Sequence, residues 1–298
     1  MKILILGASG MLGHKLLQQL APKFDVQGTL RSTPHAYANH PVLGQTPLLG
    51  GVLAEDFDSI INALALARPE VVINAIGLIK QLPGAKDPLP SIALNSLFPQ
   101  RLAKLCQASG VRMIHLSTDC VFSGKKGQYT EDDPTDAEDL YGRTKLLGEV
   151  VLPNCLTLRT SIIGRELATT SGLIEWFLSQ RKGGGGQTVN GYAKAIYSGF
   201  TTLALADIIS HVLSDHPSLS GLWQVSSEPI SKFDLLQLVN QQLKLGINIK
   251  RDETFICDRS LRSDRFRRAT GYVPPSWPAM IQALAADPTP YDLIRKER

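Results

Sequence analysis

A tyrosine and a lysine with helical spacing are the residues best suited to chemistry in this sequence. Tyr141 and Lys145 lie in the segment from Leu140 to Lys145, and on a helix both side chains would project from one face. A neighbouring ammonium favours the phenolate, so we expect the pKa of Tyr141 to fall from its ordinary value of about 10 toward neutrality. Tyr141 would then exchange a proton with a carbonyl or alcohol group.

Hydroxyl groups that could assist the same reaction precede this pair in the chain. Ser117, Thr118 and Asp119 end a predicted strand, and a hydroxyl there can hydrogen-bond the reacting carbonyl oxygen. In a carbonyl reduction Tyr141 would protonate the developing alkoxide, while Lys145 would adjust the acidity of Tyr141. The combination predicts acid/base chemistry at a carbonyl group.

A glycine-rich turn near the amino terminus predicts a dinucleotide site. It follows the apolar run from Ile3 to Leu6 and opens a helix, with the spacing G-x-x-G-x-x-G. Glycine permits a positive φ and a close approach of a pyrophosphate, and the helix amino terminus offers free N–H groups and partial positive charge. The alternative is a tight strand-to-helix turn without a ligand. The expected contacts are Gly7, Ser9, Gly10, Met11, Leu12 and Gly13.

The end of the second predicted strand favours NADPH over NADH. Arg31 and Ser32 stand where NAD-specific sites carry an acidic residue, and a 2′-phosphate requires a cation at that place. The alternative is a solvated loop arginine. We expect the adenine beside Asp56 and Phe57. The remaining cofactor contacts are expected from Asn74, Ala75, Ile76, Ser117, Tyr141 and Lys145, the last of which would hold the nicotinamide ribose.

Short apolar runs alternate with segments of helical period, as expected of βαβ units around a parallel sheet. The predicted fold is α/β, a doubly wound parallel sheet (Rossmann) with a smaller α/β carboxyl-terminal lobe for the substrate. Residues 1–160 would form the NADP-binding domain, to which some later segments return, and residues 161–298 mainly the substrate lobe. The predicted strands are Lys2 to Leu6, Asp25 to Leu30, Val71 to Ala75, Arg112 to Ser117 and Cys155 to Arg159. The predicted helices between them are Leu12 to Leu20, Ser59 to Ala67 and Leu97 to Ser109.

Beyond residue 160 the alternation is less regular. A glycine-rich run from Lys182 to Gln187 predicts a flexible loop. It is followed by a predicted helix from Leu203 to Leu213, a short strand near Leu222 to Val225 and a helix from Lys232 to Leu243. We assign these segments to the smaller lobe.

The bulk composition excludes several classes of protein. The 298 residues are 43% hydrophobic and 19% charged, as in ordinary globular proteins, and the net charge of +4 without a long basic run argues against nucleic acid as partner. The run from Ile3 to Leu6 is too short for a signal peptide or membrane span. The cysteines (Cys106, Cys120, Cys155 and Cys257) lack metal or disulfide spacing. We therefore expect a metal-free cytoplasmic protein without a membrane partner, and leave a homodimer open.

The motifs together resemble a known family. The segment from Ser117 to Gly124 (S-T-D-C-V-F-S-G), with Tyr141 and Lys145, resembles the extended short-chain dehydrogenase/reductases, most closely the dTDP-4-dehydrorhamnose reductase branch with its signature S-T-D-Y-V-F-x-G. The resemblance implies that Thr118 is the catalytic hydroxyl, Tyr141 the acid/base and Lys145 the cofactor anchor. It implies reduction by NADPH of a nucleotide-linked 4-keto-6-deoxyhexose in polysaccharide precursor synthesis.

One departure leaves the sugar open, because Cys120 replaces the tyrosine of that signature. The segments from Asn74 to Gln81 and from Tyr197 to Thr202 resemble instead reductases of UDP-activated 6-deoxy amino sugars, so a UDP-2-acetamido-2,6-dideoxy-4-ketohexose is the other candidate substrate. The cations near the substrate would face its diphosphate. The expected substrate contacts are Lys80, Cys120, Arg165, Tyr197, Arg259 and Arg262.

Two other functions are compatible with these motifs. An epimerase or dehydratase that retains NAD uses the same tyrosine and lysine for redox steps that cancel, and stoichiometric NAD in the purified protein would favour it. A regulatory subunit would bind the dinucleotide without turnover. Arg31 favours exchangeable NADPH, and the intact pair of Tyr141 and Lys145 argues against the regulatory subunit.

Overall fold

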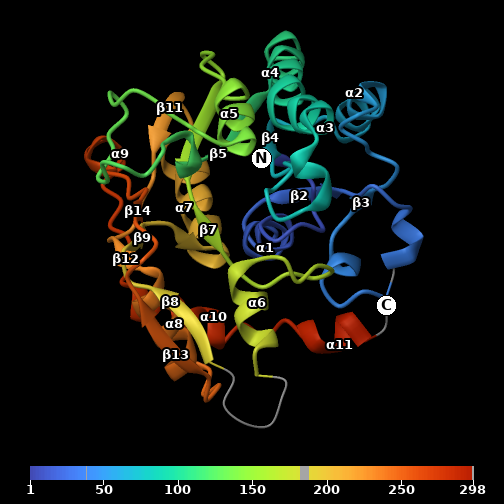
Figure 1. Ribbon diagram of the computed structural model, residues 1–298. Helices are drawn as coiled ribbons and strands as arrows, with labels where there is room; N and C mark the ends of the chain where they lie inside the picture. Colours follow the sequence, from blue (N-terminus) through green and yellow to red (C-terminus); the bar gives the residue numbers. More distant parts are fainter. Residues whose placement is uncertain (38, 182–187, 297–298) are drawn as a thin grey trace.

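A parallel sheet of seven strands lies at the centre of the computed structural model, which describes residues 1–37, 39–181 and 188–296 (Figure 1). The strand order is β3-β2-β1-β4-β5-β6-β11, and all neighbouring strands are parallel. The glycine-rich run predicted as a flexible loop lies outside the described residues. The strands are β1 Lys2–Leu6, β2 Asp25–Thr29, β3 Leu48–Leu49, β4 Val71–Asn74, β5 Arg112–Thr118, β6 Cys155–Thr160 and β11 Gly221–Gln224.

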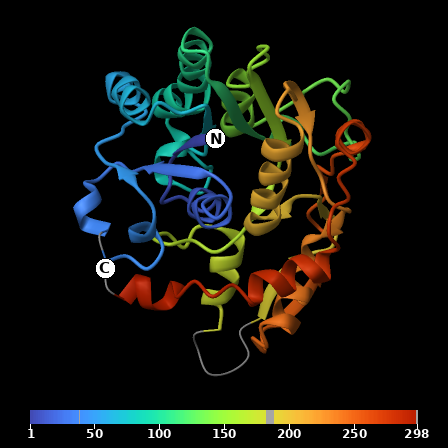
Figure 2. The ribbon, with the colours of Figure 1, turned by 180° about the vertical axis from the view of Figure 1, so that it is seen from behind.

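Helices cover both faces of this sheet, which explains why its central strands β1 and β4 are nearly continuous apolar runs. Ile3 and Ile5 of β1 pack in one hydrophobic cluster with helices α1 (Gly13–Leu20) and α7 (Thr202–Asp215), which lie against each other (Figure 2). Leu4 and Leu6 point the other way and pack against α2 (Phe57–Ala67) and α4 (Phe98–Ala108). The predicted α/β fold with a doubly wound parallel sheet is confirmed.

The strand β11, Gly221–Gln224, belongs to a different sheet from the one we predicted. We placed this strand in the smaller lobe, but β11 pairs with β6 and forms one edge of the large sheet. The helix α7 before it also packs on the large sheet, because its apolar side chains belong to the same cluster as Ile3 and Ile5. The division of the chain near residue 160 stays a prediction.

Three smaller sheets accompany the large one within the described ranges. They pair β10 with β7, β9 with β12 and β14, and β13 with β8. Their strands are β7 Ile162–Ile163, β8 Thr188–Tyr192, β9 Ala195–Tyr197, β10 Phe200–Thr201, β12 Ile230–Ser231, β13 Asn248–Asp252 and β14 Cys257–Asp258. The other helices are α3 Pro88–Ile92, the π-helical segment η4 Ala93–Leu97, α5 Leu140–Leu147, α6 Leu173–Ser179, α8 Lys232–Gln242, α9 Asp264–Thr270, α10 Trp277–Ala285 and α11 Tyr291–Lys296. Short 3-10 turns are η1 Pro34–Tyr37, η2 Leu43–Gln45, η3 Pro83–Lys86 and η5 Asp119–Val121.

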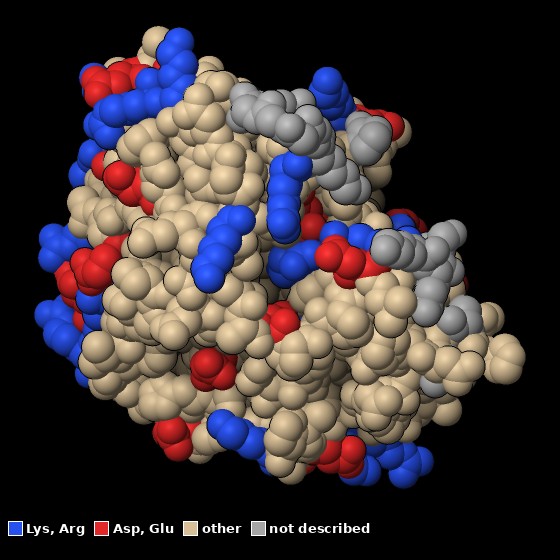
Figure 3. Space-filling view, turned by 90° about the horizontal axis from the view of Figure 1, so that it is seen from below, with Lys and Arg blue, Asp and Glu red and all other residues tan. Residues whose placement is uncertain are grey.

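The surface carries charges of both signs. On the face seen from below in Figure 3, Lys and Arg side chains lie beside Asp and Glu side chains at several places. Across the described ranges, no helix has both the length and the apolar character needed to cross a bilayer.

Candidate active site

A cleft of about 680 Å³ lies at the carboxyl edge of the large sheet, next to β1 and β4. The strand order reverses between these two strands, and this is where open α/β sheets bind ligands. The glycine turn, the strand ends, α5 and parts of the smaller sheets contribute to its walls. The predicted site residues that line it are Gly10, Met11, Leu12, Asn74, Ala75, Ile76, Lys80, Ser117, Thr118, Cys120, Tyr141, Lys145, Tyr197 and Arg259.

The glycine turn has the shape that a dinucleotide requires. Gly7 has φ +83°, and a Cβ there would lie 3.0 Å from the Ile76 side chain. A Cβ on Gly13 would lie 2.1 Å from the Gly7 carbonyl oxygen, so the helix start can approach the strand only with glycine at this position. Gly7 and Gly13 thus shape the turn without lining the cleft, whereas Gly10 lines it. The predicted contact Ser9 does not line the cleft either.

Helix α5 brings Tyr141 to the cleft because its start is capped and closely packed. The Asp139 carboxylate accepts a hydrogen bond from the Gly142 amide at 2.7 Å, which caps the helix. A Cβ on Gly142 would lie 2.1 Å from the Cys120 carbonyl oxygen. The absence of a side chain therefore lets α5 lie directly on the segment after β5, with Tyr141 on the cleft side.

Lys145 lies one helical turn after Tyr141 and is hydrogen-bonded to strand β5, which also carries Thr118. Its ammonium donates a hydrogen bond to the Leu116 carbonyl oxygen at 2.6 Å. The Thr118 hydroxyl accepts a hydrogen bond from the Cys120 amide and donates one to Asp119, both at 3.1 Å. The end of β5 therefore holds the ammonium and the hydroxyl on the same edge of the sheet.

The pKa values of this group differ from the prediction. Burial raises the pKa of Tyr141, the nearby Cys120 and Asp119 raise it further, and only the Thr118 hydroxyl lowers it. Burial also lowers the pKa of Lys145, to about 8. The predicted fall in the Tyr141 pKa is therefore wrong, because burial and the neighbouring Asp119 and Asp139 all disfavour the phenolate. Tyr141 carries its proton at neutral pH, which is the state that a proton donor needs.

Ser117 belongs to a buried charged group behind the cleft. Its hydroxyl donates a hydrogen bond to Glu149 at 2.6 Å. Glu149 also accepts two hydrogen bonds from the Arg159 guanidinium, at 2.7 and 2.8 Å, and both side chains are less than a tenth exposed. Ser117 is therefore engaged by Glu149, whereas the hydroxyl of Thr118 acts on Tyr141.

Amide side chains shape the loop after β4. Asn74 donates to the buried His115 ring at 3.1 Å and accepts from the Ile76 amide at 3.1 Å. Asn95, in the π-helical segment η4, accepts from the Leu78 amide at 2.8 Å and donates to the Leu78 carbonyl at 3.0 Å. Asn95 was not predicted as a site residue, because nothing in the sequence around it indicates a π-helical turn that directs its side chain to this loop.

Two of the predicted cations lie at the cleft. Lys80 forms an ion pair with Asp139 at 3.3 Å, with both side chains about two-fifths exposed. Arg259 donates to the Phe122 carbonyl at 2.8 Å and places another guanidinium nitrogen 3.9 Å from the Cys120 sulfur. The Arg259 guanidinium therefore lies beside Cys120, the residue that replaces the tyrosine of the S-T-D-Y-V-F-x-G signature.

A further cation at the cleft was not predicted from the sequence. Lys232, the first residue of α8, places its ammonium 3.9 Å from the centre of the Tyr197 ring. Burial lowers its pKa to about 8, against the opposing effect of Asp119 and the two neighbouring thiols. Nothing in the sequence around Lys232 predicts that a lysine at this helix start will line the cleft. Other cleft residues that were not predicted include Ser161, Trp176, Phe255 and Cys257.

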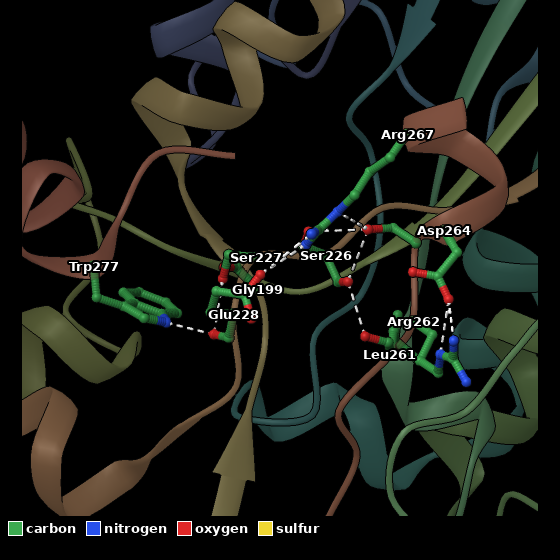
Figure 4. Close-up of polar contacts among 10 residues, drawn as sticks. Gly199, Ser226, Ser227, Glu228, Leu261, Arg262, Asp264, Arg267 and Trp277 are labelled. Carbon is green, nitrogen blue, oxygen red and sulfur yellow. Dashed lines mark hydrogen bonds and ion pairs between the residues drawn. The ribbon is translucent and has the colours of Figure 1, made fainter. Parts of the chain in front are cut away.

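Two predicted substrate residues do not line the cleft. Arg165 donates to Glu175 at 2.7 Å and lies 4.6 Å from the centre of the Tyr291 ring. Arg262 donates to Asp264 at 2.8 Å beside a separate hollow of about 90 Å³ (Figure 4). Their placement as diphosphate ligands is not supported, because each guanidinium is paired with a carboxylate away from the cleft.

The predicted adenosine residues lie beyond the lining of the cleft. Arg31 follows β2 and lies 3.3 Å from Glu55 in an ion pair whose side chains are 67% and 50% exposed. An exposed pair of this kind is worth about 0–1 kcal/mol, so a phosphate can compete for Arg31. The other residues of this group are Ser32, Asp56 and Phe57, the last two at the start of α2.

The profile of the family described as "RmlD substrate binding domain" matches residues 1–248. The chain belongs to this family. Curated relatives of this RmlD-family chain include a dTDP-4-dehydrorhamnose reductase of Streptomyces griseus, 35% identical over 49% of this chain and 43% of that protein. The spore coat polysaccharide biosynthesis protein SpsK of Bacillus subtilis is 29% identical over 55% of this chain and 52% of that protein. The chain thus spans about half the length of the curated relatives it matches.

Solved structures resemble the RmlD-family chain over nearly its whole length. A hypothetical dTDP-4-dehydrorhamnose reductase from Sulfolobus tokodaii is 26% identical with a TM-score of 0.75, over 93% of this chain and 98% of that one. The dTDP-4-dehydrorhamnose reductase of Bacillus anthracis, solved in complex with NADP, has a TM-score of 0.78 at 18% identity, over 96% and 99%. At that identity the second likeness concerns the fold.

Proposed function

We propose that this protein uses NADPH to reduce the 4-keto group of a nucleotide-linked 6-deoxyhexose, in the synthesis of a polysaccharide precursor. The observation that carries the proposal is that Thr118, Tyr141 and Lys145 line the same cleft as the glycine turn. The names of the relatives from Streptomyces griseus and Bacillus subtilis support it, as does the NADP in the Bacillus anthracis structure.

The residues present fit the cofactor. NADPH, when bound, supplies the hydride. The turn from Gly7 to Gly13 would hold the pyrophosphate, since Gly7 has a positive φ and a side chain on Gly13 would collide with the Gly7 carbonyl oxygen. Arg31 would leave Glu55 for the 2′-phosphate, and the adenine would lie beside Phe57. Lys145 would hold the nicotinamide ribose.

The chain's own residues would supply the proton and place the sugar. Tyr141 would donate its phenolic proton to the carbonyl oxygen as this becomes an alkoxide, and the Thr118 hydroxyl would hydrogen-bond the same oxygen. Lys80, Arg259 and Lys232 would bind the diphosphate. The cleft of about 680 Å³ falls within the ~300–1,000 Å³ usual for small-molecule sites.

The function is tested with purified protein, NADPH and a panel of dTDP- and UDP-linked 4-ketosugars. We expect NADPH oxidation with at least one of them and formation of the corresponding 4-hydroxy sugar nucleotide. The proposal is wrong if no member of the panel supports turnover. Stoichiometric NAD bound to the purified protein would also contradict it and favour an epimerase or dehydratase.

The reaction is expected to slow in alkaline solution. Burial places the pKa of Lys145 at about 8, so its ammonium is present below this pH and is lost above it. We therefore expect kcat/KM to fall as the pH rises through about 8. A pH profile of kcat/KM measures this, and the variant Lys232→Met should keep the alkaline limb. A profile that stays level through this range would show that the Lys145 charge is not used.

Lys232 is expected to contribute to substrate affinity. The variant Lys232→Met removes a charge beside Tyr197 and should raise KM for the nucleotide sugar roughly tenfold, the effect of losing one charged hydrogen bond, with kcat little changed. The exposed Lys250 of β13 provides the matched control Lys250→Met, which should leave KM unaltered. Equal KM values for both variants would remove Lys232 from the site.

A homodimer is part of the same proposal. Leu89 and Ile92 of α3, Leu97 of η4 and Leu147 of α5 are exposed apolar side chains on helices that pack together. Exposed apolar side chains on neighbouring helices favour association with another protein surface. Light scattering of the purified protein is expected to give the mass of two chains, and a mass of one chain would contradict it.

A further inference from the structure

The last helix, α11, contacts two segments that border the cofactor end of the cleft. One is the glycine turn, of which Gly10, Met11 and Leu12 line the cleft. The other is the segment from Arg165 to Ser179, which contains α6 and contributes Gly172 and Trp176 to the lining. These two walls approach each other, since a Cβ on Gly172 would lie 3.7 Å from the Met11 sulfur.

Tyr291 connects α11 to the glycine turn through a buried histidine. The His14 ring nitrogen Nδ1 lies 2.8 Å from the Gly10 carbonyl oxygen, and Nε2 lies 2.9 Å from the Tyr291 hydroxyl. A carbonyl oxygen can only accept, so Nδ1 carries the hydrogen. The one hydroxyl hydrogen of Tyr291 is donated to the Asp287 carboxylate, so it is the phenol oxygen that contacts Nε2. The phenol thereby packs against the imidazole that holds the carbonyl of the turn.

A buried ion pair keeps Tyr291 in place. The Tyr291 hydroxyl donates at 2.9 Å to the Asp287 carboxylate, which pairs with the Lys15 ammonium at 2.6 Å. Lys15 follows His14 on α1, and both partners of the pair are at most 5% exposed. A pair this deeply buried has few alternative positions, so the chain before α11 is held against α1.

Arg295, one turn further along α11, connects the helix to the opposite wall. Its guanidinium donates to the buried Glu175 carboxylate of α6 at 2.7 Å and to the Glu166 carbonyl at 3.1 Å. The same Glu175 accepts from Arg165, whose guanidinium lies 4.6 Å from the centre of the Tyr291 ring. One short helix therefore contacts both walls through hydrogen-bonded side chains.

We propose that Tyr291 and Arg295 are positioning residues, which hold the glycine turn and the segment around α6 at the separation that the dinucleotide needs. This inference rests on the proposed function, because it takes the ligand at the turn to be NADPH. It assigns to the carboxyl-terminal helix a role in cofactor affinity without contact with the reacting atoms.

The test compares NADPH affinity in variants of the 298-residue chain. Tyr291→Phe removes only the hydroxyl, and Arg295→Gln removes the charge on the other wall. Each is expected to weaken NADPH binding roughly fivefold to tenfold in a fluorescence titration, while kcat at saturating NADPH stays within about twofold of wild type. Leu293→Ala, an exposed position on the same helix, should change neither value. Arg295→Gln carries the test by itself where Tyr291→Phe does not accumulate as folded protein.

A second control separates positioning from general loss of stability. Val239→Ala in α8 truncates a buried side chain and should lower the melting temperature without changing NADPH affinity. Wild-type affinity in both Tyr291→Phe and Arg295→Gln, or an equal loss in Val239→Ala, would overturn the inference and leave the proposed function standing. Failure of the wild-type protein to bind NADPH would instead overturn the proposed function.

Discussion

Replacing Tyr141 with phenylalanine is expected to lower kcat by roughly 10²- to 10⁴-fold, the usual contribution of a positioned general acid. The phenol is buried, and its pKa is raised, so in the native protein it holds its proton at neutral pH. Reduction of a carbonyl group needs that proton, and phenylalanine has none to donate. Steady-state kinetics with the responding ketosugar measures the effect.

The controls for this prediction are binding and a second tyrosine. NADPH affinity and melting temperature should stay close to wild type in Tyr141→Phe, since only one oxygen atom is removed. Tyr272→Phe, at a half-buried tyrosine outside the cleft lining, should keep full activity. Full activity in Tyr141→Phe would mean that another group donates the proton, and the proposed mechanism would have to be abandoned.

Replacing Glu149 with glutamine is expected to destabilise the protein by roughly 3 to 5 kcal/mol, the usual cost of leaving one partner of a buried ion pair uncompensated. The Arg159 guanidinium is 6% exposed and depends on Glu149 for two hydrogen bonds, at 2.7 and 2.8 Å. Its remaining nitrogen has no hydrogen-bond partner among the described residues. Chemical denaturation of the variant and wild type measures the difference in the free energy of unfolding.

An exposed ion pair provides the comparison. Glu138 pairs with Lys125, and their side chains are 64% and 75% exposed, so Glu138→Gln should cost less than about 1 kcal/mol. Combining Glu149→Gln with Arg159→Met removes the isolated charge and should recover part of the lost stability. If Glu149→Gln and Glu138→Gln lowered the free energy of unfolding equally, the buried pair of Glu149 and Arg159 would not be a significant source of stability.

Local sequence determined the elements that carry the proposed acid/base pair. The apolar run of β1 and the glycines after it specify a strand and a tight turn through backbone conformation alone, and Gly7 has the positive φ that this turn requires. Tyr141 and Lys145 face the same cleft because they are one helical turn apart. Such features depend on neighbours within a few residues, and could therefore be predicted.

Only the tertiary structure decided which charges reach the cleft and how they ionise. Lys232 is brought to Tyr197 by the packing of α8 against β9, whereas Arg165 is drawn to Glu175 and α11. Nothing in the sequence around either cation distinguishes them. The acidity of Tyr141 was likewise set by burial, which depends on residues distant in the chain. Desolvation and ion pairing act between segments that meet only in the folded protein, and for that physical reason a motif could locate the phenol but could not determine its pKa.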